Sequence, residues 1–170
     1  MQTPFRRQAV TTQTCRPVPA PVPGHAGLTA PAACQLSTRD FWYLREHYRR
    51  CLAAGTGAHL RLAALIHAKM GRAEVIPMRE VDPALATGGS RLIFALDDQP
   101  VRSGLLLHWG YCGAGLRRLG VPSLLGITLL GMRVGQRCDM PRDRGAGPFA
   151  ATVRLIRVVW QPEDHGRDPI

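Results

Sequence analysis

Two apolar stripes of helical spacing, separated by a short glycine-rich break, constrain the fold of this chain most strongly. Ser37 can cap the first helix, and Asp40, three residues on, can return the bond as a capping box. The first stripe runs to about Ala54 and consists of Phe41, Leu44, Tyr48, Cys51 and Leu52. After Gly55-Thr56-Gly57 the second stripe continues to Gly71 through Leu60, Leu62, Ala63, Leu65, Ile66 and Met70. The pattern predicts a helical hairpin.

From Val75 onward, β-branched and turn residues replace the helical pattern. We expect strands at 91–96, 104–108, 116–119 and 150–160, a short helix at 123–130 and a hairpin tip at 144–148. The last strand has apolar residues at both odd and even positions, which is typical of a central strand covered on both faces. A helical hairpin followed by a mainly antiparallel sheet with one short helix predicts an α+β fold.

The net charge of +10 predicts an acidic partner. Residues 38–73 carry seven of the basic side chains against Asp40 and Glu46, whereas the 97 residues after them carry twelve Arg against ten acids. We therefore assign partner binding to the hairpin, through exposed cations: Arg45, Arg49, Arg50, Arg61 and Lys69. Because 21 of the 22 basic residues are Arg, compositional drift is the alternative explanation.

Several features exclude other classes of protein. The five cysteines lie too far apart for a zinc or redox motif, so we expect reduced thiols, no metal and no cofactor. No apolar run is long enough to span a membrane and no secretory signal is evident, so a cytoplasmic location is expected. His47, His59 and His67 on or beside the hairpin are interpreted as solvated. Residues 1–35, rich in proline, and 165–170 are expected to be tails.

The segment 122–136 resembles part of the C-terminal domain of the Gre transcript-cleavage factors and of Rnk, the regulator of nucleoside diphosphate kinase. In that family a short helix reads P-L-G-x-A-L-L-G-x-x-V-G, and seven residues here fall in register with it: Leu125, Gly126, Leu129, Leu130, Gly131, Val134 and Gly135. Gln161, Pro162 and Glu163 match the end of Rnk-like chains. Where many relatives have T-M-N-S before the first long strand, this chain has Thr87-Gly88-Gly89-Ser90, which we expect to loosen that loop.

The resemblance implies a truncated Gre-type coiled coil at 36–73 and an FKBP-like domain at 74–164. It also implies a non-enzymatic transcription regulator that binds RNA polymerase, with no membrane partner and an oligomeric state left open. Gre factors present carboxylates at the tip of a long coiled coil, and here the tip at 53–58 has none, so transcript cleavage is not expected. The alternative function is direct nucleic-acid binding by the basic hairpin, with Trp42 and Tyr43 free to stack on bases. An enzyme such as an isomerase ranks third, because a fold alone does not confer an activity.

Overall fold

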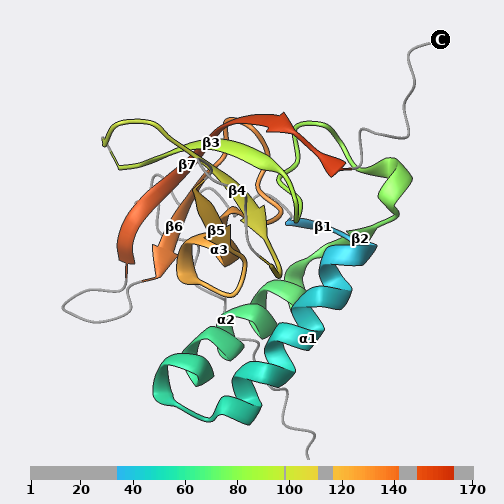
Figure 1. Cartoon of the computed structure of the whole chain (residues 1–170), viewed down its shortest axis with the longest axis vertical. Helices are drawn as coiled ribbons and strands as arrows, with labels where there is room; N and C mark the ends of the chain where they lie inside the picture. Colours follow the sequence, from blue (N-terminus) through green and yellow to red (C-terminus); the bar gives the residue numbers. More distant parts are fainter. Residues whose placement is uncertain (1–33, 98, 111–116, 142–148, 163–170) are drawn as a thin grey trace, which may run out of the picture. The chain divides into compact units, whose positions relative to one another are not determined.

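The computed structural model describes residues 34–97, 99–110, 117–141 and 149–162, all of which lie in the unit Pro31–Ile170 (Figure 1). Most of the predicted N-terminal tail, the C-terminal tail and the hairpin tip at 144–148 fall outside the described residues. Gln35, predicted to belong to the tail, lies instead in strand β1 (Gln35–Ser37).

The predicted helical hairpin is confirmed. Helix α1 spans Thr38–Ala54 and helix α2 spans Gly57–Arg72, and the two lie side by side on one side of the sheet (Figure 1). The Ser37 side chain accepts a hydrogen bond from the Asp40 backbone N–H at 3.1 Å, as predicted, and Gly55 ends α1 with a φ of 63°. Leu52 and Leu60 are 45% and 46% exposed, contrary to their place in the predicted stripes, because they lie near the tip.

A small parallel pair of strands, which the sequence analysis did not predict, joins the two ends of the hairpin. Strand β1 pairs with β2 (Glu74–Ile76), so that Leu36 lies opposite Val75. Each strand has only three residues, too few to produce a periodic pattern. A short 3₁₀ helix, η1 (Met78–Glu80), follows β2.

The main sheet has the strand order β5-β4-β3-β7-β6. Its strands are β3 (Arg91–Leu96), β4 (Arg102–Leu107), β5 (Arg118–Gly120), β6 (Arg137–Pro141) and β7 (Phe149–Trp160), and helix α3 spans Leu124–Leu129. The fold is α+β, as predicted, with β3 at the predicted residues. The sheet is mixed, however, because β5 pairs with β4 in parallel. None of the helices described is long and apolar enough to cross a membrane.

The interpretation of β7 as a strand covered on both faces is wrong. It pairs with β3 and β6, but only one face is buried, at Val153 and Leu155, whereas Arg154 and Arg157 are exposed. Register shifts against β3 place Leu155 opposite Phe94 and Arg157 opposite Ile93, so Ile156 is an extra residue on β7. Such bulges change which positions of the strand point inward. This explains why β7 has apolar residues at both odd and even positions.

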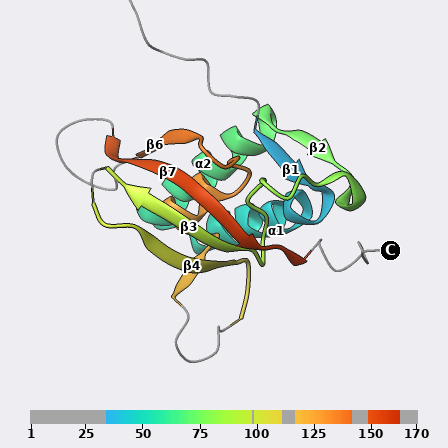
Figure 2. The ribbon, with the colours of Figure 1, turned by 90° about the horizontal axis from the view of Figure 1, so that it is seen from above.

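One hydrophobic cluster joins the hairpin to the sheet. It includes Leu44 and Ile66 from the helices and Leu92, Phe94 and Leu155 from the sheet, all of them fully buried. In the view of Figure 2, β7, β3 and β4 lie in front of the helices, so the helices cover only one face of the sheet.

Candidate functional site

The family-motif residues hold α3 and the residues directly after β7 against their neighbours. A Cβ on Gly126 would collide with the carbonyl oxygen of Gly120, and a Cβ on Gly131, whose φ is 75°, would stand 2.5 Å from the carbonyl oxygen of Gln35. Glycine is therefore required at both positions. Of the other motif residues, Leu129, Leu130 and Gln161 are buried, Leu125 and Pro162 are partly buried, Val134 and Gly135 are exposed, and Glu163 lies outside the described residues. These residues build the fold and offer no reactive group.

A buried cluster of three polar side chains, Asp40, His47 and His108, fixes the hairpin to the sheet. This cluster is called the polar node. Both carboxylate oxygens of Asp40 accept from the Gly88 backbone N–H, at 3.1 and 3.3 Å, and His108 Nε2 lies 2.9 Å from Asp40 Oδ1. His108 Nδ1 in turn lies 3.2 Å from His47 Nε2. The carboxylate of Asp40 therefore does not return a capping-box bond to Ser37, contrary to expectation, because it is bound to Gly88 and His108, far along the chain.

The loop Thr87-Gly88-Gly89-Ser90 is anchored by this node, not loosened. Gly88 is buried, and a Cβ there would stand 2.7 Å from Asp40 Oδ1 and would collide with the His108 ring. The Arg39 guanidinium also donates to the Gly88 carbonyl at 2.7 Å. The absence of a side chain at Gly88 is what allows the carboxylate to reach its backbone N–H.

His47 is buried, 2% exposed, and not solvated as predicted. Burial above all, together with the neighbouring His108 and Arg50, lowers the pKa of His47 to about 4, and Glu46 opposes this shift only weakly. His47 is thus neutral near pH 7 and can share a hydrogen bond with His108. His59 and His67 are exposed, as expected, with His59 bound to Thr56 and His67 against the Tyr48 ring.

Aromatic rings cover the outer side of this node. Tyr43 packs against His108 with ring centroids 4.8 Å apart, and the Trp109 ring lies 4.0 Å from that of His47. The Arg50 guanidinium lies over Trp109, 4.2 Å from the ring centroid. Tyr43 is 38% exposed and partly engaged by His108, whereas Trp42 is 59% exposed with Arg45 over its ring at 4.8 Å.

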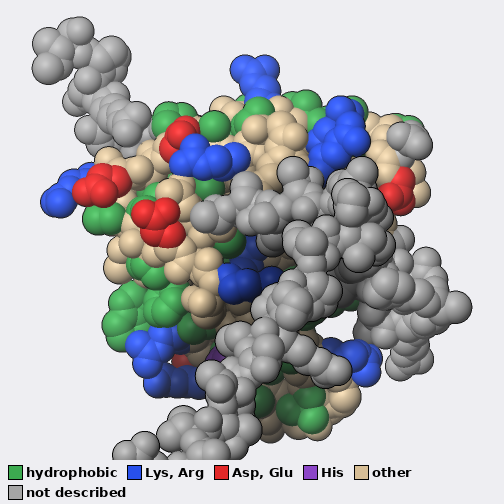
Figure 3. Space-filling model, turned by 180° about the vertical axis from the view of Figure 1, so that it is seen from behind, with side chains coloured by type: hydrophobic (Ala, Val, Ile, Leu, Met, Phe, Trp, Pro, Cys, Tyr) green, Lys and Arg blue, Asp and Glu red, His purple; other side chains and the backbone are tan. Residues whose placement is uncertain are grey.

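The five predicted partner-binding cations differ in their exposure. Arg49, Arg50 and Arg61 are exposed and Arg45 is partly buried. Lys69 is also partly buried, beside the thiols of Cys34 and Cys138, and burial lowers the pKa of Lys69, although both thiols oppose this. Lys69 is therefore a correction to the predicted set. Viewed from behind, basic side chains occur at several separate places (Figure 3).

Sequence reasoning missed His108, Trp109 and Gly88. The Asp40–His108 contact joins residues 68 positions apart and the Asp40–Gly88 contact joins residues 48 apart. Neither pair has a local spacing that could reveal it. The only available signal was the unusual glycine pair at Gly88 and Gly89 in the loop.

Comparison with known proteins supports the fold. No protein-family model and no curated protein matches the chain. The prokaryotic transcription elongation factor GreA/GreB from Nitrosomonas europaea has a solved structure that is similar with a TM-score of 0.54 and 20% identity, over 75% of this chain and 99% of that chain. Gfh1 from Thermus aquaticus has a TM-score of 0.36 and 16% identity, over 73% and 96% of the two chains. The first likeness establishes a GreA/GreB-like fold for this chain.

Proposed function

We propose that this protein is a cytoplasmic, non-catalytic regulator that binds RNA polymerase and is of the Rnk type. In this proposal the hairpin is a truncated Gre-type coiled coil and residues 74–164 form an FKBP-like docking domain. The observation that carries the proposal is the GreA/GreB-like fold, with 75% of this chain and 99% of the elongation factor's chain covered. Function does not follow from fold alone, so the features of the hairpin supply the rest of the argument.

The surface of the hairpin carries little acidic charge. Of its two carboxylates, Asp40 is 1% exposed and is used within the fold. Glu46 is bound to Arg50 at 2.8 Å. Arg49 is exposed and Arg45 is partly buried with its guanidinium over the Trp42 ring, while both carboxylates of α1 are already engaged elsewhere. This charge supports an acidic docking surface as the partner.

We expect reversal of charge at these two positions to slow association with the polymerase. The double variant Arg45→Glu/Arg49→Glu should bind immobilised bacterial RNA polymerase about tenfold more slowly at low salt, with a weaker salt dependence, because surface charges act mainly on the association rate. The measurement is biolayer interferometry at two salt concentrations. The control Arg72→Glu/Arg79→Glu changes the same charge at exposed residues outside α1. Equal rates for all three proteins would contradict a role for α1 and leave the sheet domain as the docking surface.

We also expect no stimulation of transcript cleavage. The tip between α1 and α2 contains only Ala, Gly and Thr, so it has no carboxylate to help hold a metal ion. The 17 residues of α1 give a rod of about 25 Å, which is short for reaching deep into a channel. The measurement is RNA length in stalled elongation complexes, with a Gre factor as positive control. Metal-dependent shortening above the rate without any factor would refute the non-catalytic assignment.

A second candidate, nucleic-acid binding by the hairpin, has weaker support. It needs at least two exposed rings beside the cations for base stacking. On α1, Trp42 is 59% exposed, but Tyr43 is only 38% exposed and packs against His108.

A further inference from the structure

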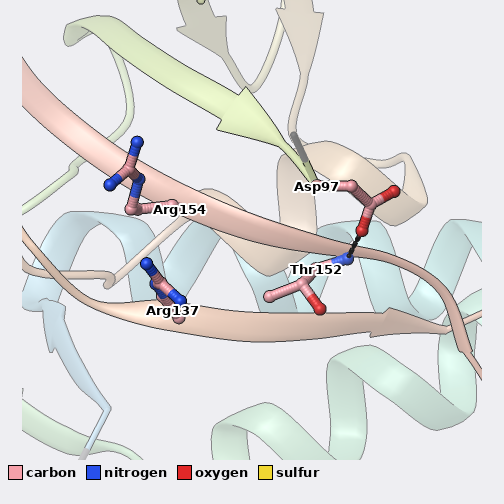
Figure 4. A pocket seen from close by; sticks show the side chains of 4 residues that line it. All are labelled: Asp97, Arg137, Thr152 and Arg154. Carbon is pink, nitrogen blue, oxygen red and sulfur yellow. Dashed lines mark hydrogen bonds between the residues drawn. The ribbon is translucent and has the colours of Figure 1, made fainter. Parts of the chain in front are cut away.

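A hollow of about 330 Å³ on the main sheet is lined by Asp97, Arg137, Thr152 and Arg154 (Figure 4). The Thr152 backbone N–H donates to Asp97 Oδ1 at 2.7 Å, and the Thr152 hydroxyl donates to Asp139 Oδ1 at 2.9 Å. Charges of both signs therefore lie together here, and they select no single class of ligand. Nucleophilic side chains gather elsewhere in the described part of the chain, at the base of the hairpin.

Two thiols and an amine meet where the hairpin joins the sheet. Cys34 directly precedes β1, Lys69 lies in the last turn of α2, and Cys138 lies on β6. A hydrogen bond joins the Lys69 amino group and the Cys34 thiol, and the Cys138 thiol lies close enough to both to interact with their charges. The three residues are far apart in the sequence, so only folding brings them together. This group is called the thiol cluster.

Backbone pairing and core packing hold the two cysteines in place. The Cys34 carbonyl accepts from the Glu74 backbone N–H at 2.9 Å, and a Cβ added to Gly131 would stand 2.9 Å from the Cys34 sulfur. Cys138 is paired with Val153 between β6 and β7. Both cysteines pack against the hydrophobic cluster that joins the hairpin to the sheet. Both are free and partly exposed, so a small solute can reach their thiols.

The amine of the thiol cluster can act as a base. Of the 22 basic residues of the chain 21 are Arg, which stays protonated in proteins, so the single lysine stands where an amine can lose its proton. Burial lowers the pKa of Lys69, although both thiols oppose this. The amine can therefore take the proton of the Cys34 thiol, and the resulting ammonium group stabilises the thiolate. Burial raises the pKa of Cys138, so Cys138 keeps its proton until a later step.

We propose that the thiol cluster is a redox-sensing site at which hydrogen peroxide converts Cys34 and Cys138 into a disulfide. The Cys34 thiolate attacks one peroxide oxygen, so that an S–O bond forms and the O–O bond breaks. The departing hydroxide takes the proton from Lys69 and leaves as water, and Cys34 becomes a sulfenic acid.

Cys138 resolves this sulfenic acid. Its thiol gives its proton to the Lys69 amine, which is neutral again, and its sulfur attacks the sulfur of Cys34. The S–S bond forms, the S–O bond breaks, and hydroxide leaves with the proton of Lys69 as a second water. The two sulfurs together lose two electrons, which the peroxide gains.

The disulfide links the residue before β1 to β6 and so locks the base of the hairpin onto the sheet. A transient disulfide of this kind suits a reducing compartment, where disulfides mainly serve catalysis or redox sensing, and cellular thiols reverse it. The thiol cluster uses none of the residues assigned to polymerase contact. The proposal therefore stands independently of the proposed function.

The test is treatment of the full chain with hydrogen peroxide, followed by digestion without reductant and mass spectrometry of the peptides. A peptide pair joined through Cys34 and Cys138 should form, lighter by two hydrogen atoms than the separate peptides, and should disappear with dithiothreitol. Lys69→Met and Lys69→Gln remove the base and should each slow formation of the pair about tenfold. Two substitutions are used so that one keeps the apolar stem and the other the polar end, and thermal unfolding checks that each variant folds.

The other cysteines supply the controls. Cys51→Ala removes a buried thiol of α1, which is 4% exposed, and should change the rate less than twofold. Cys15 and Cys112 lie outside the described residues, and the variant Cys15→Ser/Cys112→Ser removes them as competing partners. In that variant the Cys34–Cys138 pair should still form at the rate of the native protein.

Three results would overturn the proposal. The first is no Cys34–Cys138 pair in the native protein after peroxide treatment. The second is oxidation of Cys34 to the sulfinic acid with Cys138 still reduced, which would show that Cys138 does not resolve it. The third is formation of the pair at the native rate in both folded Lys69 variants, which would show that the amine takes no part.

Discussion

Replacing Asp40 by alanine should lower the free energy of unfolding by about 2–6 kcal/mol, because two buried hydrogen-bonding partners, at about 1–3 kcal/mol each, are left without an acceptor. The partners are His108 Nε2, at 2.9 Å, and the Gly88 N–H. Urea unfolding followed by circular dichroism measures the loss. Glu46→Ala is the control, since that carboxylate forms an exposed ion pair with Arg50, and it should cost at most about 1 kcal/mol.

The same contact can be tested from the loop. Gly88→Ala places a Cβ against Asp40 and His108, and overpacking of this kind costs about 1–3 kcal/mol. Gly71→Ala is its matched control, because a Cβ there meets nothing within 4 Å and lies inside α2, where alanine is favoured over glycine. The prediction fails if Asp40→Ala costs no more than Glu46→Ala, or if the two glycine variants behave alike.

The elements that could be predicted from the sequence are those specified by neighbouring residues. The Ser37 cap, the break at Gly55 and the stripe containing Leu44 and Cys51 act within a few residues, and both helices lie where they indicate. Strand β3 is also specified locally, as an apolar run between two turns. The α+β class follows from the order of these elements.

What could not be predicted depends on contacts between distant segments. His47 has the sequence environment of a solvated helix residue, and only the approach of His108, 61 residues later, buries it. The parallel pairing of β4 with β5 and the bulges of β7 are likewise decided by packing between strands. The charge count placed the cationic surface on the hairpin, whereas folding also gathers exposed arginines from the four strands β3, β5, β6 and β7. Summing charge along segments cannot detect such a surface.

His47 should make the protein markedly less stable as the pH falls from 6.5 to 4. A histidine in the unfolded chain titrates near pH 6.5, whereas burial lowers the pKa of His47 in the folded protein to about 4. Between these values the unfolded state binds the extra proton, so stability falls with falling pH. The contribution of neutral His47 is fully present above pH 6.5 and is lost progressively down to pH 4, to a total of about 3 kcal/mol.

The measurement is the free energy of unfolding in urea at several pH values between 4 and 7. His47→Gln keeps a neutral group that can bond to His108 Nδ1 but cannot titrate, so its stability should depend less on pH across this window, whatever the substitution costs at pH 7. His59→Gln removes an exposed histidine bound only to its own helix cap and should leave the pH dependence of the native protein intact. Carboxylates that titrate below pH 5 contribute equally to all three proteins, so the differences between their curves isolate His47. Parallel curves for the native protein and His47→Gln would mean that His47 is accessible to protons in the folded state and that the node does not exclude the charged form.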